Sequence, residues 1–568
     1  MRRRHSRRTT TPSTITTTTT STSIRARRPS LTFRRQELLL ALPPAALLLV
    51  WLGLLLASFG AIVGVIYSNA DIVSAPVIGE LFPKAPSDAT TVLGYLPWYT
   101  TLWFELATRW VPFHRQLWEV GPWLVSIGGI VLVAWSTAKA AGRWAGLFVA
   151  FVLVCAGDRL LPIQFGSDLH GATAVYVCLL DAYLVLLVTR GGRIGGPVTH
   201  VALCGVVAAL TAAGLASDNL LIPAGLAPFL TAAVTQLWWA PRPVGRRIAI
   251  SSFAIGVAAA IGAAIAVEAM HRVHVYAAET TIVFVGWNEL VDHVTELVQS
   301  LADLFNGDFG GAAIGARSLL AFACAVAVVA GLVAAWRLGR EQLGRLRAGG
   351  PPITAVREAH VTFWLLALAL PTAAFVLSGF GQIGGARYLV ASGYGIVVLA
   401  AVALAPRGHL ARAVGVVAAS LVVTASVVAL ASGDIRANSG HYPRQDFARF
   451  LTTFTQGEGL KYGYASYWVA AALTWETSTR IEVYPVLPCS SPGGLCTYPL
   501  HVTTSWYLPR ARTRTFVVLD PRYGPTPADL HFGNAVEVAS YGEYKIYVYD
   551  HDVAANLGDW RRYGAAAS

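Results

Sequence analysis

The sequence predicts a polytopic α-helical membrane protein of about eleven transmembrane helices with a small C-terminal α/β domain. The 568-residue chain is 55% hydrophobic and only 13% charged, and its mean hydropathy is +0.54. Charge this sparse, together with repeated long apolar runs, is typical of chains that cross a bilayer several times. The formal net charge of +12 does not indicate nucleic-acid binding, because much of it lies in the N-terminal tail and in short loops, where membrane topology explains it.

The N-terminal tail, residues 1–37, is rich in Arg, Thr and Ser and nearly free of apolar side chains. Such a segment cannot bury enough surface to fold, so we expect it to be disordered; an organelle transit peptide is the alternative. Pro43 and Pro44 would break a helix entering from the tail, which places the start of the first span just after them. Residues 45–66 carry no charge and would form roughly 33 Å of helix, enough to cross the hydrocarbon core.

The predicted transmembrane domain covers residues 38–431. Its expected spans lie near residues 45–66, 120–138, 143–161, 172–189, 197–215, 220–239, 249–269, 313–336, 360–378, 388–405 and 412–431. Lys and Arg concentrate in alternate loops, for example Arg242, Arg246 and Arg247 in one of them. This bias predicts a cytoplasmic N-terminus and places everything after the eleventh span outside the cell.

Two of the predicted exterior loops, residues 68–119 and 271–312, are too long to be simple connectors. In the first, Trp103, Leu106 and Trp110 recur at helical spacing. In the second, apolar residues recur at three- and four-residue steps through Leu290, Val294, Leu297, Leu301 and Leu304. Both patterns predict amphipathic helices, which lie either in the membrane interface or against the bundle.

The C-terminal region, residues 432–568, has the composition of a soluble domain. Helical patterns alternate there with short β-branched runs, which is typical of a small α/β layer domain. We expect helices at residues 446–454 and 468–475, and strands at residues 460–464, 480–486, 515–519, 535–539 and 544–549.

Six cysteines divide between the two regions. Those in or beside the predicted spans, where cysteine behaves as a small apolar residue, are Cys155, Cys178, Cys204 and Cys324. Cys489 and Cys496 instead bracket a loop rich in Ser, Pro and Gly. This spacing predicts a disulfide, which requires an oxidising compartment. A metal pair is the alternative, but two further ligands are lacking.

Ionisable residues gather at the predicted exterior ends of the spans, where they are costly unless they are paired or functional. Asp71 follows the first span, and Arg387 opens the tenth. The others are Asp158, Arg159, Asp168, His170 and Asp218. Each has an ordinary structural explanation as a helix cap, a solvated loop residue, an ion pair or a snorkelling anchor. Their gathering on one side of a bundle indicates a site that faces the outer leaflet.

Two short stretches carry a resemblance to a known family. Residues 384–390 read GGARYLV, and residues 462–468 read YGYASYW. The first resembles the start of a late span, and the second the opening of the exterior domain, in bacterial mannosyltransferase-like members of the GT-C glycosyltransferase superfamily. The long first span, the large first loop with an acid at its start and the exterior C-terminal domain resemble that superfamily too. Its members are integral membrane enzymes that use polyprenyl-phosphate sugars.

The resemblance implies transfer of a sugar from a polyprenyl-phosphate donor to an acceptor hydroxyl on the outer face of a bacterial plasma membrane. Such a reaction needs a base for the acceptor and cations for the departing phosphate. Asp71 fits the base, and Arg387 fits the phosphate clamp, since a guanidinium binds two phosphate oxygens. Arg159 and His170 are further phosphate partners. Asp168 would orient the acceptor or help to hold a divalent metal.

The acceptor stays open between a glycan, a lipid and a protein. The protein mannosyltransferase branch usually has an Asp-Glu pair in the first loop, whereas Ile72 follows Asp71 here. The sugar, the stereochemistry and the need for a metal are open as well. A transporter or lipid flippase is one alternative function, since Gly256 and Gly262 would suit close helix packing, and a catalytically silent scaffold for protein–protein contacts is another. Against a transporter, the spans contain few charges and no repeated halves.

Overall fold

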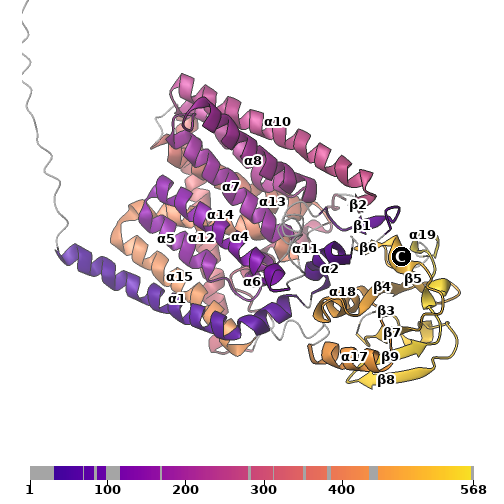
Figure 1. Ribbon diagram of the computed structural model, residues 1–568. Coiled ribbons are helices and arrows are strands. Elements are labelled where there is room, and N and C mark those ends of the chain that lie inside the picture. The colour runs from indigo at the N-terminus through magenta and orange to yellow at the C-terminus, as the bar shows by residue number, and fades with distance from the viewer. Residues whose placement is uncertain are drawn as a thin grey trace, which may run out of the picture.

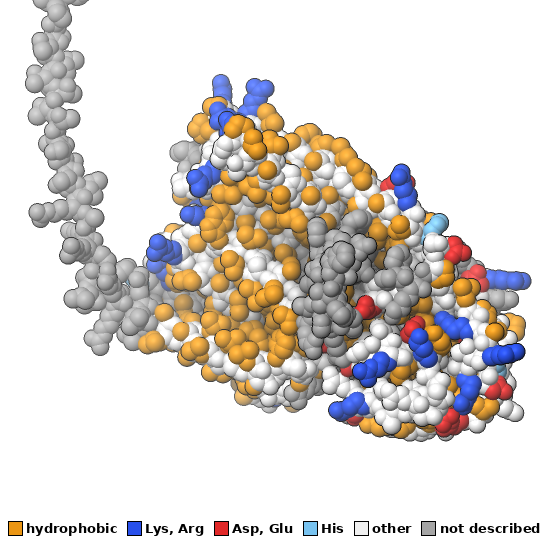
Figure 2. Space-filling view, in the orientation of Figure 1, with side chains coloured by type: hydrophobic (Ala, Val, Ile, Leu, Met, Phe, Trp, Pro, Cys, Tyr) orange, Lys and Arg blue, Asp and Glu red, His pale blue; other side chains and the backbone are white. Residues whose placement is uncertain are grey.

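A helical bundle with a small α/β domain at one end makes up the computed structural model (Figure 1). The residues it describes are 31–67, 69–81, 86–96, 115–166, 169–278, 283–310, 313–348, 353–379, 381, 385–433, 445–522 and 524–563. In Figure 2, apolar side chains cover the visible flank of the bundle, and Lys and Arg side chains gather at the end away from the α/β domain. An apolar flank of this kind suits contact with lipid.

Among the described residues, eight helical stretches are long and apolar enough to cross a membrane. They are Ala41–Ile66, Trp118–Ala141, His170–Thr189, Pro197–Ser217, Arg242–Arg272, Ala316–Ala348, Ala355–Leu377 and Gly385–Ser432. The protein is therefore a polytopic helical membrane protein, as predicted. The expected number of eleven spans is not confirmed.

Two expected spans are not among these eight stretches. In place of residues 143–161 the structure has α5 (Arg143–Val154), 12 residues or roughly 18 Å of helix. In place of residues 220–239 it has a π-helical turn, η2 (Ile222–Leu226), followed by α9 (Ala227–Trp239).

Two further expected spans lie within one long helical stretch. They correspond to α14 (Val390–Leu404) and α15 (Gly408–Ser432), which only the short 3-10 turn Ala405–Arg407 separates. The remaining helices of the bundle are α1 (Leu31–Ile66), α4 (Arg115–Ala141), α6 (Leu160–Phe165), α7 (Leu169–Thr189), α8 (Pro197–Ser217), α10 (Arg242–Arg272), α12 (Ala316–Ala348) and α13 (Ala355–Leu377).

The first helix begins earlier than the sequence predicts. It starts at Leu31, inside the segment expected to be disordered, and Pro43 and Pro44 lie within it. Proline is tolerated in membrane helices, because local adjustments and neighbouring groups satisfy the carbonyls that it leaves without a donor. The helix packs against α15, the last helix of the bundle, so the two ends of the transmembrane region lie together.

The two long loops contain one helix each among the described residues. The helix expected around residues 102–110 lies outside them. The first loop instead opens with α2 (Ala70–Leu81), which the sequence did not predict. The second loop contains the expected helix as α11 (Leu290–Asp303). Leu301 and Leu304 are buried, and α11 packs against α13, so its apolar face is covered in part by the bundle.

A three-stranded sheet ties both loops to the C-terminal domain. The strand β1 (Thr91–Leu93) of the first loop pairs in parallel with β2 (Val275–Ala277) of the second. On its other side β1 pairs antiparallel with β6 (Val502–Thr503) of the C-terminal domain. Main-chain hydrogen bonds thus hold three distant segments together at one end of the bundle, where the candidate site lies.

The C-terminal domain contains a mixed six-stranded sheet of order β5-β4-β3-β7-β9-β8. Its strands are β3 (Tyr462–Ala465), β4 (Glu482–Pro488), β5 (Leu495–Thr497), β7 (Thr515–Leu519), β8 (Glu537–Tyr541) and β9 (Tyr544–Tyr549), and its helices are α17 (Gln445–Gly457), α18 (Tyr467–Glu476) and the short α19 (Trp560–Tyr563). All seven expected elements are confirmed, whereas β5, β6 and α19 were not predicted. Cys489 and Cys496 form a disulfide between β4 and β5.

The domain is packed onto the bundle rather than tethered to it. Helix α18, which connects the parallel strands β3 and β4, contacts α2. One apolar core extends from the bundle into the domain and includes Trp475 and Trp506 of the domain. This packing brings the first residue of α18, Tyr467, to the first turn of α2.

Candidate functional site

Asp71 lies in the first turn of α2, at the junction of the bundle and the C-terminal domain. Asn69 caps this helix: its side-chain oxygen accepts a hydrogen bond of 2.9 Å from the backbone N–H of Asp71. Asp71 itself is therefore not the cap of this helix, which was one of the ordinary structural explanations for the acids at the span ends. A carboxylate in a first turn is also favoured by the helix dipole.

The two oxygens of the Asp71 carboxylate contact two different chain segments. Arg387 Nη1 donates a hydrogen bond of 3.2 Å to Oδ2, and the Tyr467 hydroxyl donates one of 2.8 Å to Oδ1. Arg387 lies in η3 (Gly385–Leu389), which leads into α14. The Asp71 and Arg387 side chains are 30% and 38% exposed. Segments more than 300 residues apart in sequence thus meet at one partly exposed carboxylate.

His170 joins this cluster through Tyr388. The Arg387 guanidinium lies 5.3 Å from the centroid of the Tyr388 ring, and that ring lies 4.6 Å from the His170 ring, measured between centroids. His170 Nδ1 is 3.0 Å from a carboxylate oxygen of Asp218. Thr173 donates a hydrogen bond to the same oxygen. The Asp218 carboxylate thereby fixes the orientation of the imidazole.

Aromatic residues of the C-terminal domain enclose the other side of Asp71. The Tyr467 ring stacks on Tyr498 at 4.8 Å between centroids, and the His501 ring lies 5.9 Å from it. Burial, with a smaller contribution from the Asp71 charge, holds the pKa of Tyr467 well above its usual value. Tyr467 therefore remains a neutral hydroxyl that can donate to Asp71.

His501 is a neutral histidine in this cluster. Burial lowers its pKa to about 4, and the Asp71 charge opposes the shift only in part. Its backbone has a φ of 52°, in the left-handed region that non-glycine residues rarely adopt. Such strain persists only where surrounding packing imposes it, and here the Tyr95 and Tyr467 rings pack against the imidazole.

The structure brings together three of the five residues predicted for the site: Asp71, Arg387 and His170. Arg159 lines a separate cavity that also contains Asp303. Asp168 lies outside the described residues. Within the described part of the chain, no group of three His, Cys, Asp or Glu side chains is arranged to hold a metal.

The sequence did not point to Tyr467, Tyr388 or His501 as site residues. The first two lie inside the stretches YGYASYW and GGARYLV, so those stretches carried a signal for them. His501 has no such signal, because only the pairing of β6 with β1 brings it near Asp71.

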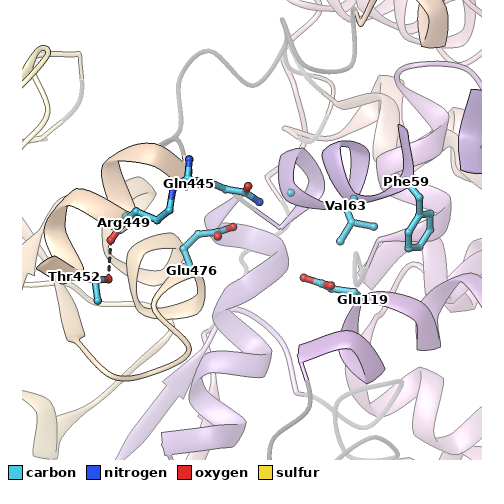
Figure 3. Close-up of a pocket in the computed structure, with 10 residues that line it drawn as sticks. Phe59, Val63, Glu119, Gln445, Arg449, Thr452 and Glu476 are labelled. Carbon is cyan, nitrogen blue, oxygen red and sulfur yellow. Dashed lines mark hydrogen bonds between the residues drawn. The ribbon is translucent and has the colours of Figure 1, made fainter. Parts of the chain in front are cut away.

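A cavity of about 390 Å³ lies between the bundle and the C-terminal domain (Figure 3). The end of α1, including Val63, forms one wall, and Glu119 and Glu476 point into the space from α4 and α18. Tyr67, one turn after Val63, stacks on Trp475 at 5.5 Å between ring centroids. The cavity is therefore adjacent to the turn that leads from α1 into α2 and Asp71.

A second acid–base pair lies inside the bundle. Asp181 of α7 and His360 of α13 are fully buried and lie 2.8 Å apart, measured from Oδ1 to Nδ1. Ser136 donates a hydrogen bond to the other carboxylate oxygen, and the Thr137 hydroxyl lies 3.2 Å from His360 Nε2. These residues were not predicted from the sequence, although a polar residue in an otherwise apolar helix is a usable signal.

No known family model, no curated protein and no solved structure matches this chain. The geometry of the site and general chemistry therefore carry the evidence for its function.

Proposed function

We propose that this protein is a membrane glycosyltransferase that moves a sugar from a polyprenyl-phosphate donor to an acceptor hydroxyl. One observation supports the proposal above all others. The Asp71 carboxylate and the Arg387 guanidinium lie 3.2 Å apart and are both partly exposed, at the junction of the bundle and the C-terminal domain. A base beside a permanent cation is what proton abstraction from an acceptor and binding of a departing phosphate require.

In the proposed reaction, Asp71 accepts the proton of the acceptor hydroxyl while that oxygen bonds to the anomeric carbon. The bond between this carbon and the phosphate oxygen breaks, and the electron pair leaves with the phosphate. Arg387 binds the phosphate as its charge increases. Tyr467 holds one oxygen of the Asp71 carboxylate, which orients the other oxygen toward the acceptor. Arg387 contacts the Asp71 carboxylate when no substrate is bound. Binding of the donor would move the guanidinium to the phosphate, and Asp71 would then be available as a base.

The membrane orientation belongs to the same proposal. The Lys and Arg bias of the loops supports a cytoplasmic N-terminus and a site on the outer face of the plasma membrane. The disulfide between Cys489 and Cys496 agrees with an oxidising compartment for the C-terminal domain. We propose that the chain crosses the membrane eleven times and that α5, α9, α14 and α15 each form one crossing. An odd number of crossings places the two termini on opposite sides of the membrane.

The test is transfer of a labelled sugar from a panel of polyprenyl-phosphate donors by the purified full-length protein. We expect transfer with at least one donor, and a loss of at least 100-fold in Asp71→Asn without loss of folding. Asp292→Asn is the matched control, because Asp292 is an exposed acid on α11. Equal transfer by wild type and Asp71→Asn, or no transfer with any donor, would contradict the proposal.

A transporter or lipid flippase is the second candidate, and the buried Asp181–His360 pair favours it. Ionisable residues inside membrane spans occur in the proton relays of transporters. This function predicts substrate or lipid flux in liposomes that responds to a pH gradient and is abolished by His360→Gln. Sugar transfer without such flux would exclude it.

A further inference from the structure

A charged cavity of about 260 Å³ lies at the end of the bundle that carries the C-terminal domain. It is formed where the loop after α5, the end of α11, the start of α12 and the end of α15 meet. Its charged lining residues are Asp158, Arg159, Asp303, Asp308 and Arg317. The cavity therefore presents two guanidinium groups and three carboxylates, a mixture of both signs rather than a patch of one.

An apolar groove of about 150 Å³ lies further along the same helices. On α12, Ala321 lines the charged cavity, and Val328, two turns further along, lines the groove. On α15, Ala425 lines the cavity and Val422 lines the groove, less than one turn away. The groove thus lies deeper in the bundle than the charged cavity, between the membrane-spanning helices α12 and α15.

The two spaces together match the chemistry of a phospholipid with a zwitterionic headgroup. A phosphate is suited to bind Arg159 and Arg317, and a primary ammonium is suited to bind the carboxylates. A quaternary ammonium has no N–H to donate to a carboxylate, and a headgroup without an amine supplies no cation of its own to the carboxylates when its phosphate binds the guanidinium groups. Inorganic phosphate has no apolar part that could fill the groove.

We propose that this cavity and groove bind an aminophospholipid, a phospholipid whose headgroup carries a phosphate and a primary ammonium. The site is separate from the Asp71 cluster, and the inference does not depend on the proposed glycosyltransferase activity. An acyl chain in the groove would fill the space between α12 and α15, and the headgroup would lie at the level where the spans end.

The charge balance of the cavity supports this ligand. Burial, together with the nearby charges of Asp308 and Asp158, raises the pKa of Asp303 to about 6, and Arg159 opposes this rise. A bound ammonium would favour the ionised carboxylate. Since Asp303 binds a proton below pH 6 and then loses its charge, binding should be weaker at pH 5 than at pH 7.5. The other cationic group facing this space is Arg317.

The test is native mass spectrometry of the full-length protein with equimolar phosphatidylethanolamine, phosphatidylglycerol and phosphatidylcholine of identical acyl chains. We expect at least tenfold preference for phosphatidylethanolamine. The double variant Arg159→Gln/Asp303→Asn should lose this preference. Its matched control is Arg272→Gln/Asp292→Asn, which changes exposed residues elsewhere on the same end of the bundle.

A second variant tests the groove. Ala330→Leu places a larger side chain at the groove lining and should reduce binding of all three lipids at least fivefold. Val329→Leu is its control, because Val329 is exposed on the same helix and does not line the groove. Equal binding of the three lipids by the wild type, a preference for phosphatidylglycerol, or unchanged binding in both test variants would overturn the proposal. If the double variant fails to fold, Arg159→Gln alone, at an exposed position, decides the headgroup claim.

Discussion

Two acid–base pairs in this molecule differ in what surrounds them. Asp181 and His360 are fully buried between membrane-spanning helices, and side chains of α4 contact both of them. Asp71 and Arg387 lie at the junction with the C-terminal domain, and about a third of the surface of each side chain is exposed. The first pair has its hydrogen-bonding groups occupied by the protein, whereas the second can exchange a protein partner for a ligand.

This difference separates stabilising pairs from candidate reacting pairs. Breaking a buried pair leaves an uncompensated polar group in an apolar region, which lowers the free energy of unfolding. Breaking a partly exposed pair costs little, because water solvates the remaining group. The comparison therefore predicts that substitutions at Asp181 change the stability of the protein, and that substitutions at Arg387 and Tyr467 change its activity.

The largest expected effect on stability is that of Asp181→Ala. It leaves His360 and Ser136 without their shared partner and should lower the free energy of unfolding by about 3 kcal/mol. Thermal unfolding in detergent, followed by tryptophan fluorescence, measures the loss. Asp292→Ala, the removal of an exposed acid on α11, should leave the midpoint within a degree or two. A similar midpoint for both variants would show that burial does not distinguish the two pairs.

Arg387→Gln should mainly weaken donor binding. The loss of a charge-assisted contact to phosphate is worth about 2 kcal/mol, or roughly thirtyfold in kcat/KM for the donor. Arg387→Lys should restore part of this loss, since it keeps the charge without the bidentate geometry. Donor titrations in the transfer assay measure both. If Arg387→Gln and Arg387→Lys lowered kcat equally and left the KM for the donor unchanged, this result would contradict the role of Arg387 in phosphate binding.

The hydropathy of the chain was sufficient to predict a polytopic bundle, because long apolar runs have few other stable environments. It did not predict α2, whose sequence ADIVSAPVIGEL has no clear amphipathic period, or the continuation of α1 through Pro43 and Pro44. The position of charged residues at span ends predicted that Asp71, Arg387 and His170 would gather. Tyr467 lies 396 residues from Asp71 in sequence, and no local pattern encodes that contact; it depends on the packing of α18 against α2.

His501 should make the C-terminal domain sensitive to acid. Its folded pKa of about 4 lies below the unfolded value of about 6.5, so the unfolded state binds the proton first. Stability is therefore fully present above pH 6.5 and decreases as the pH falls toward 4, by about 2 kcal/mol between pH 7.5 and pH 5. Thermal unfolding of wild type and His501→Gln across this range measures the effect, which the variant should lack. An equal pH dependence of the two proteins would contradict it.

The smallest expected effect is that of Tyr467→Phe. It removes one hydrogen bond to Asp71 and retains the stacking with Tyr498, so transfer should fall about fivefold, which corresponds to about 1 kcal/mol. Tyr464→Phe is the matched control, because the Tyr464 hydroxyl binds Asp552 inside the domain. A larger loss of transfer in the control than in Tyr467→Phe would remove Tyr467 from the site.

The most direct measurement of the central claim is chemical rescue of Asp71→Ala. The variant removes the carboxylate and leaves space beside Arg387, and added formate supplies a small carboxylate in its place. We expect sugar transfer by Asp71→Ala to be nearly absent without formate and to rise with its concentration, while the wild type shows no increase. Transfer by Asp71→Ala at the wild-type rate without formate would contradict the assignment of Asp71 as the base.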